Sequence, residues 1–225
     1  MLIDTGEKGF GKEIAARCAE QGIEKLDYLI LTHFDQDHVG GAARVLRELP
    51  VGCVLQSCYP KKSVEYTHYL KALRRAGLEP VTVRGELSFT LDGVVFTVNA
   101  PRLERYADSP SNNSSLIVTV ECGDCRLLFL GDAENARLSE WLESDPAPCA
   151  FVKLPHHGAW HSALVRLMEE LRPGCALITS SEEEPESPKT LDLLALFSVD
   201  TYFTREAPVA LFCNGSGVTL SYVEG

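Results

Sequence analysis

Hydrophobic residues follow two spacings along this chain, one typical of buried strands and one typical of amphipathic helices. Short apolar runs predict strands, and apolar positions three or four residues apart predict helices. In the first half these elements are strands at 26–31 and 51–56 and helices at 12–21, 42–49 and 63–76. Each helix is followed by Gly22, Pro50 or Gly77, residues that commonly mark helix ends.

After residue 86 the pattern of apolar residues becomes typical of β-hairpins. Residues 87–98 form a predicted hairpin around Asp92-Gly93, and residues 115–130 form another around Cys122-Gly-Asp-Cys125. The remaining predicted elements are helices at 134–142, 162–171 and 188–197, strands at 150–154 and 175–179, and a last hairpin of 209–213 with 218–222. Strands mixed with helices and hairpins predict an α/β chain with mixed sheets, which we interpret as one domain over residues 1–225.

The composition and charge of the chain argue against some classes of function. The chain has 225 residues, 45% of them hydrophobic, and a net charge of −11, which is typical of a soluble globular protein. The acidic charge argues against loose electrostatic binding of nucleic acid, although bound metal ions could supply positive charge. The only paired basic residues, Lys61-Lys62 and Arg74-Arg75, are interpreted as helix surface. No transmembrane run or signal peptide is recognised, so we expect a cytoplasmic protein.

The eight cysteines are scattered, mostly in apolar surroundings, and we expect reduced core residues. One pair, Cys122 and Cys125, has the spacing of half a zinc site, but a second such pair is lacking. We therefore interpret Gly123-Asp124 as a hairpin turn that places the two cysteines opposite each other.

The most informative stretch is Leu-Thr-His-Phe-Asp-Gln-Asp-His-Val-Gly-Gly at 31–41. Its four potential metal ligands are His33, Asp35, Asp37 and His38. They follow a predicted strand and precede a helix, so their side chains can converge at the carboxyl edge of a sheet. A polar loop that caps the next helix is the alternative. One or two divalent ions would explain why two imidazoles and two carboxylates lie so close together.

At these residues the sequence resembles the metallo-β-lactamase superfamily, whose first metal motif is His-x-His-x-Asp-His. Asp35 stands in place of the second histidine, a variant that resembles the subgroup around the DNA-uptake competence protein ComEC. Further family motifs follow in the same order: Leu2-Ile3-Asp4-Thr5-Gly6, Ser111-Asn112-Asn113-Ser114-Ser115, Gly131-Asp132 and Pro155-His156-His157-Gly158. The resemblance implies an αββα sandwich of two mixed sheets flanked by helices.

The resemblance also implies a ligand set. His33 and Asp35 would hold a first metal ion, and Asp37 and His38 a second. Asp132 would bridge the two ions. Either histidine of the Pro-His-His-Gly motif could approach the metal, and we take His156 as the ligand and His157 as a catalytic group.

Other roles follow from the same comparison. Asp37 would orient the attacking water or take its proton, and His157 would stabilise the oxyanion or protonate the leaving group. Asp4 would accept a hydrogen bond from a ligand histidine. Asn112 or Asn113 stands where the family usually has a third-motif histidine, and would act as a weak ligand or bind substrate.

Two departures from the family bear on these expectations. Ser187-Pro188 stands where ComEC-like chains often have His-Pro, which could reduce the site to one ion or none. The family usually has one or two strands before Leu2, so we expect those strands to be missing and a sheet edge to be open. An open edge can pair with a second copy of the chain.

We therefore expect a hydrolase that uses one or two divalent ions, zinc or manganese, to activate water. DNA or a small phosphodiester is the expected substrate, by analogy with the ComEC-like subgroup. A hydrolase of another ester, a lactone or a thioester is one alternative. A non-catalytic binding module that kept the fold is the other.

Overall fold

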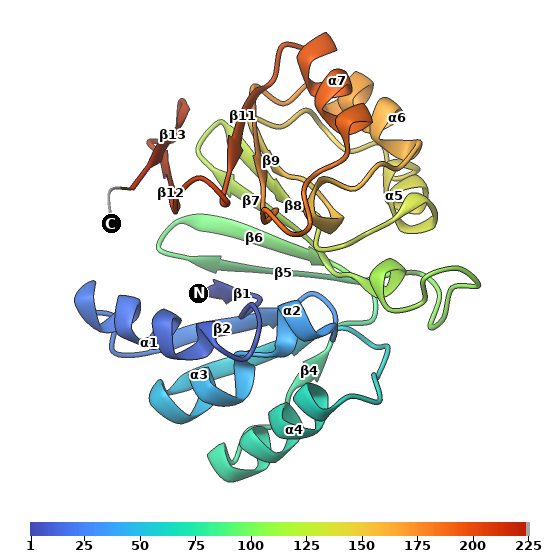
Figure 1. Ribbon diagram of the computed structural model, residues 1–225. Coiled ribbons are helices and arrows are strands. Elements are labelled where there is room, and N and C mark those ends of the chain that lie inside the picture. Colours follow the sequence, from blue (N-terminus) through green and yellow to red (C-terminus); the bar gives the residue numbers. More distant parts are fainter. Residues whose placement is uncertain (224–225) are drawn as a thin grey trace.

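Two β-sheets lie face to face in the computed structural model, which describes residues 1–223 (Figure 1). The smaller sheet has the order β1-β2-β3-β4, and its described pairings are all parallel. Its strands are β1 (Leu2–Ile3), β2 (Leu26–Leu31), β3 (Val51–Gln56) and β4 (Val81–Thr82). This sheet is therefore parallel rather than mixed, because helices connect β1 to β2, β2 to β3 and β3 to β4.

The larger sheet has seven strands in the order β11-β10-β9-β8-β7-β6-β5. The strands are β5 (Glu86–Leu91), β6 (Val94–Asn99), β7 (Ile117–Cys122), β8 (Cys125–Phe129), β9 (Phe151–Lys153), β10 (Cys175–Ile178) and β11 (Asp200–Phe203). Strands β5 to β8 pair antiparallel and β8 to β11 pair parallel, so this sheet is mixed as expected. The last hairpin, β12 (Val209–Cys213) with β13 (Val218–Tyr222), forms a separate two-stranded sheet.

Helices cover the outer faces of both sheets, as Figure 1 shows. The smaller sheet carries α1 (Phe10–Glu20), α3 (Ala42–Glu48) and α4 (Val64–Ala76), with the short α2 (Gln36–Val39) above its edge. The larger sheet carries α5 (Asn135–Leu142), α6 (Ala163–Leu171) and α7 (Pro188–Leu196). This is the predicted αββα sandwich. No helix within residues 1–223 is long and apolar enough to cross a membrane.

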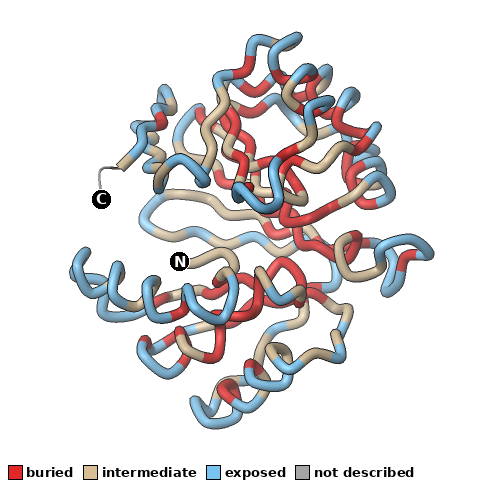
Figure 2. Tube along the Cα trace, in the orientation of Figure 1, coloured by how far each residue is buried: buried red, intermediate tan, exposed pale blue. Residues whose placement is uncertain are grey.

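The core has three parts, which match these layers. One cluster fills the space between the sheets, where Ile30 and Leu55 of the smaller sheet meet Val98 and Val118 of the larger one. A second cluster lies between the smaller sheet and its helices, and a third between the larger sheet and α5 to α7. Figure 2 shows the buried segments gathered in these layers. The shared cluster fixes the two sheets relative to each other.

The cysteines differ in part from the expectation. Cys122 and Cys125 lie opposite each other across the β7–β8 turn, as predicted, and all eight cysteines are free. Cys125 and Cys149 are buried, and Cys18, Cys53 and Cys175 are half-buried and pack against the core, whereas Cys58, Cys122 and Cys213 are half-buried outside the core clusters. The β12–β13 turn covers this hairpin, because the amide of Asp124 donates to the carbonyl of Gly215 at 2.7 Å.

Short elements were missed. The sequence did not predict β4, β11 or α2, which have two, four and four residues. β1 lies at one edge of the smaller sheet and β4 at the other. Pairing of such an edge with a second copy stays a prediction.

Candidate metal centre

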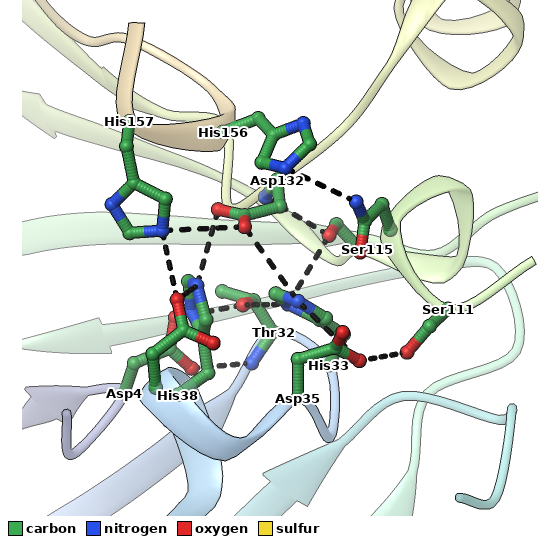
Figure 3. Close-up of polar contacts among 12 residues, drawn as sticks. Asp4, Thr32, His33, Asp35, His38, Ser111, Ser115, Asp132, His156 and His157 are labelled. Atoms are coloured by element: carbon green, nitrogen blue, oxygen red, sulfur yellow. Dashed lines mark hydrogen bonds and ion pairs between the residues drawn. The ribbon is translucent and has the colours of Figure 1, made fainter. Parts of the chain in front are cut away.

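Loops that follow four strands meet at one edge of the sandwich. Asp4 follows β1, the His33–His38 segment follows β2, Asp132 follows β8, and the two adjacent histidines 156 and 157 follow β9. Figure 3 shows the rings of His33, His38 and His157 directed toward Asp132, which lies between them. These motifs are far apart in the sequence, and they lie together at one edge of the sandwich, as the sequence predicts.

Two glycines allow this close approach. A Cβ atom at Gly41 would collide with the carbonyl oxygen of Thr5, so only glycine lets the β1 loop lie against α2. Both the amide and the hydroxyl of Thr5 donate to the carbonyl of His38 at 2.8 Å. Gly131 has a left-handed φ of 54°, and a Cβ there would lie 3.0 Å from Thr32 and Ser115 side-chain carbons.

The tautomer of His38 is set by Asp4. Nδ1 of His38 donates to Oδ2 of Asp4 at 2.7 Å, and Asp4 also accepts from the amide and the hydroxyl of Thr32 at 2.8 and 2.7 Å. The proton on Nδ1 leaves the lone pair of Nε2 facing Oδ1 of Asp132, 3.1 Å away. This is the contact expected for Asp4.

His157 is oriented in the same way from the opposite side. Its Nδ1 donates to the carbonyl of Thr179 at 2.7 Å, so its Nε2 faces Oδ2 of Asp37 at 2.8 Å and Oδ2 of Asp132 at 3.5 Å. The backbone of His157 has a left-handed φ of 53°, and that of His156 one of 46°. Such strain in side-chain-bearing residues is characteristic of functional sites.

His33 completes the pattern. The Thr32 hydroxyl donates to Asp4, so it accepts from Nδ1 of His33 at 3.1 Å. Nε2 of His33 is buried without a hydrogen-bond partner and lies 3.8 Å from Oδ2 of Asp132. Burial, followed by the neighbouring His38, lowers the pKa of His33 to about 4, so this imidazole is neutral.

Three imidazole lone pairs therefore face carboxylate oxygens, and two acceptors repel each other unless a positive charge lies between them. One atom each from Asp37, His38, Asp132 and His157 lies within 4.8 Å of the other three. Nε2 of His38 and Oδ1 of Asp132 are buried without hydrogen-bond partners. These oxygen and nitrogen donors fit a divalent cation such as zinc or manganese.

Protons take the place of that charge in the metal-free chain. Burial lowers the pKa of His157, but hydrogen bonds to Asp132 and Asp37 outweigh it and raise the value to about 9. The pKa of His38 is also raised, since Asp4 and Asp132 outweigh burial. The pKa values of Asp37 and Asp132 are lowered: burial raises them, but the neighbouring histidines outweigh it. Protonated imidazoles thus balance the two carboxylates when no ion is bound, and a divalent ion would replace those protons.

The placement of the adjacent histidines differs from the expected one. We expected His156 as the ligand and His157 as the catalytic group, but His157 is the one that joins the cluster. Nδ1 of His156 lies 3.4 Å from Oε1 of Glu134, and its Nε2 lies 3.4 Å from Nδ2 of Asn112. The consecutive left-handed residues turn the two rings in different directions, which residue order alone does not reveal.

Asp35 is directed toward other partners. Its Oδ1 accepts from the Ser111 hydroxyl and lies 2.5 Å from Nζ of Lys61 and 3.9 Å from Nε2 of His33. The pKa of Asp35 is lowered, because these hydrogen bonds outweigh burial. The interpretation of Lys61 as helix surface was wrong, since Lys61 lies in the loop between β3 and α4. Nothing in its local sequence signals this contact across the fold.

The two asparagines separate into different roles. Oδ1 of Asn113 accepts from the amides of Glu134 and Arg137, and this buried side chain therefore caps α5 rather than facing substrate. Asn112 donates to Glu134 at 2.8 Å, beside His156. The backbone amide of Ser187 donates to the carbonyl of Gly158 at 3.1 Å, so the residue that replaces a family histidine lies close to the histidine turn.

Comparison with known protein families shows which family this chain belongs to. A family model described as "Metallo-beta-lactamase superfamily" matches residues 1–179. The chain belongs to the metallo-β-lactamase superfamily. The expected ComEC-like similarity is also confirmed: the chain is 32% identical over 187 residues to ComE operon protein 3 of Bacillus subtilis (strain 168), covering 80% of this chain and 23% of that protein. It is 26% identical over 190 residues to Recombination protein 2 of Haemophilus influenzae, covering 82% and 22%.

The chain spans less than a quarter of the length of these relatives. Solved structures of the same superfamily share the fold. Tm1679, a metal-dependent hydrolase of the β-lactamase superfamily, superposes with a TM-score of 0.57 at 14% identity, covering 89% of this chain and 84% of that one. The metallo-β-lactamase fold protein YhfI from Bacillus subtilis gives 0.55 at 12% identity, covering 90% and 83%.

Proposed function

We propose that this metallo-β-lactamase-fold chain is a metal-dependent hydrolase. The observation that carries the proposal is the set of imidazole lone pairs facing Asp37 and Asp132, each fixed by a hydrogen bond on the other side of its ring. Asp37, His38, Asp132 and His157 would hold the ion. A divalent ion in such a site lowers the pKa of a bound water to a value near neutrality and polarises the substrate.

The surrounding residues support hydrolysis. The side chain of Asp37 is 40% exposed, so one part of it reaches solvent and can orient the attacking water or accept its proton. The side chain of His156 is 34% exposed, and its Nδ1 lies 3.4 Å from Oε1 of Glu134. We therefore assign proton donation to the leaving group to His156, the role first expected for His157.

We propose a phosphodiester, and DNA in particular, as the substrate class. The sequence similarity to ComE operon protein 3 and Recombination protein 2 supports this class. A cavity of about 530 Å³ borders the centre at Asp35 and is lined on another side by Lys61 and Lys62. Two ammonium groups at this opening would attract an anionic phosphodiester toward a chain that is otherwise acidic.

The test is hydrolysis of bis(p-nitrophenyl) phosphate and of single- and double-stranded DNA with added Mn²⁺ or Zn²⁺. Chelation should abolish the activity, and Asp37→Ala should reduce kcat/KM by at least about a hundredfold, the effect of losing a group that acts on the reacting atoms. The matched control is Asp92→Ala, in an exposed hairpin turn. Unchanged hydrolysis after both chelation and Asp37→Ala would refute the proposal.

Two alternatives have their own readouts. Hydrolysis of p-nitrophenyl acetate, a lactone or a thioester, without any phosphodiesterase activity, would indicate another ester class. The replacement of a family histidine by Ser187 favours the second alternative, a binding module. That module would fold normally and hydrolyse none of these substrates at saturating metal.

A further inference from the structure

The carboxylate of Asp35 already has a cationic partner. Nζ of Lys61 lies 2.5 Å from its Oδ1, and the hydroxyl of Ser111 donates to the same oxygen. Nε2 of His33 lies 3.9 Å from that oxygen on the remaining side. An ammonium group is therefore adjacent to the position where His33 and Asp35 would hold an ion.

This pair is partly shielded from solvent. The side chain of Lys61 is 34% exposed and that of Asp35 is 25% exposed, so their attraction is screened less than that of a surface pair. The loop that carries Lys61 is anchored nearby, because the Ser57 hydroxyl donates to the carbonyl of Ser114 at 2.7 Å. Both partners of Asp35 thus come from segments tied to each other.

The other half of the centre lacks such a cation. The cluster of Asp37, His38, Asp132 and His157 contains four contacts between an imidazole nitrogen and a carboxylate oxygen, and no lysine or arginine contact among those described. The Asp35 side of the centre therefore contains the permanent charge of Lys61, whereas the Asp37 side depends on a bound ion or on protonated imidazoles.

We propose that Lys61 supplies the second positive charge of the centre in place of a second metal ion. The centre then binds a single divalent ion, at Asp37, His38, Asp132 and His157, and this inference rests on the proposed function for that ion. A divalent ion between His33 and Asp35 would be repelled by the adjacent ammonium and would share an oxygen with two hydrogen-bond donors. Asp35 is thereby a partner of Lys61 rather than a metal ligand.

The arrangement also gives Lys61 a role toward substrate. Lys61 and Asp35 both line the cavity of about 530 Å³, together with Tyr59 and Lys62. An ammonium group has three N–H donors, and Asp35 accepts from one of them. The others can bind an anionic oxygen of a substrate that enters through this cavity, which is the task that a second ion would otherwise perform.

The test counts ions in the full chain by calorimetric titration with Mn²⁺, with electron paramagnetic resonance to detect coupled pairs. Wild type should bind one Mn²⁺ per chain. Lys61→Met keeps the aliphatic stem and removes the charge, and it should raise the affinity for a second Mn²⁺ at least about tenfold and produce a coupled signal. His33→Ala added to Lys61→Met should return the count to one.

Lys62→Met is the matched control and should leave the count at one, and Lys61→Gln provides a second uncharged variant if Lys61→Met does not fold. Two tightly bound ions in wild type, or a count of one in both folded Lys61 variants, would overturn the role of Lys61 and leave the hydrolase proposal intact. No bound ion in wild type or in any variant would overturn the metal centre itself.

Discussion

The carboxylate of Asp4 accepts a hydrogen bond of 2.7 Å from Nδ1 of His38, a residue on a different loop. The same carboxylate accepts two hydrogen bonds from Thr32, so it cannot rotate away from the imidazole. Asp4 therefore fixes both the ring orientation and the tautomer of His38. Its own left-handed φ of 55° indicates that the loop is strained to place it there.

Replacement of this carboxylate should weaken metal binding without removing a metal-contacting group. In Asp4→Asn the amide is a poorer acceptor for the Nδ1 proton, so Nε2 of His38 is less basic and less well oriented. We expect about a 10- to 100-fold loss of Mn²⁺ affinity, measured by competition with a chelating dye.

The control is Asp92→Asn, at an exposed turn position that also has a left-handed φ, of 49°. Asparagine tolerates that conformation, so its Mn²⁺ affinity should equal that of wild type. Equal affinities of Asp4→Asn and wild type would contradict the role given to Asp4.

The two adjacent histidines should give different phenotypes. His157→Ala removes a cluster ligand and should lower Mn²⁺ affinity, whereas His156→Ala should preserve affinity and reduce kcat by about 10²- to 10⁴-fold, the range for loss of a general acid. His68→Ala, on the exposed face of α4, is the control for both measurements. The reverse pattern, with affinity lost only in His156→Ala, would restore the original sequence-based assignment.

Much of the fold follows from local sequence. The runs at 26–31 and 51–56 form β2 and β3 at the predicted residues, because apolar runs bounded by helix stops leave few alternatives. Ser63, the first residue of the predicted helix, accepts a hydrogen bond from the amide of Tyr66 and caps α4, and Gly77 ends that helix with a left-handed φ. These features depend on residues close together in the chain.

The details of the centre depend on distant residues and were not predictable in the same way. The choice between His156 and His157 depends on two left-handed φ angles, and the state of Asp35 depends on Lys61 in a separate loop. Both asparagines of the Ser-Asn-Asn motif looked equivalent in the sequence. Only the position of α5 shows that Asn113 caps that helix.

Arg137 stabilises the structure behind the centre. It is fully buried, and its guanidinium donates to the carbonyls of Ser115 and Asn99, to the side chain of Asn99 and to Glu140. Arg137→Met fills similar space but leaves these acceptors without their donor. The free energy of unfolding should fall by about 3–5 kcal/mol, the range for breaking a buried ion pair.

Urea denaturation followed by circular dichroism measures this change. The control is Arg75→Met, because Arg75 is exposed on α4 and its replacement should alter the unfolding free energy by less than about 0.5 kcal/mol. A typical single hydrogen bond contributes about 1 kcal/mol to stability. A smaller loss of unfolding free energy in Arg137→Met would show that this network contributes little.

Stability should fall in alkaline solution because of two buried tyrosines. Burial, together with the hydrogen bond to Glu140, raises the pKa of Tyr106, and burial raises that of Tyr69, whose hydroxyl donates to Gln56 at 2.6 Å. A raised folded-state pKa means that the native state retains protons that the unfolded state loses above a pH of about 10. This contribution is complete below that pH and is lost as the pH rises further.

The urea midpoint of wild type should therefore decrease between pH 8 and 10.5, whereas Tyr106→Phe and Tyr69→Phe should each decrease less. These pH values bracket the unperturbed tyrosine pKa of about 10. Identical alkaline decreases in wild type and in both variants would contradict the assignment of this effect to the two phenols.

The central claim is that Asp37, His38, Asp132 and His157 share one divalent cation. An anomalous difference map from crystals grown with Mn²⁺, recorded on both sides of the manganese absorption edge, tests it most directly. The account predicts a peak about 2.0–2.3 Å from one nitrogen or oxygen of each residue, the usual range for such ligands. A map without a peak among these four side chains, at a Mn²⁺ concentration that saturates the protein, would contradict it.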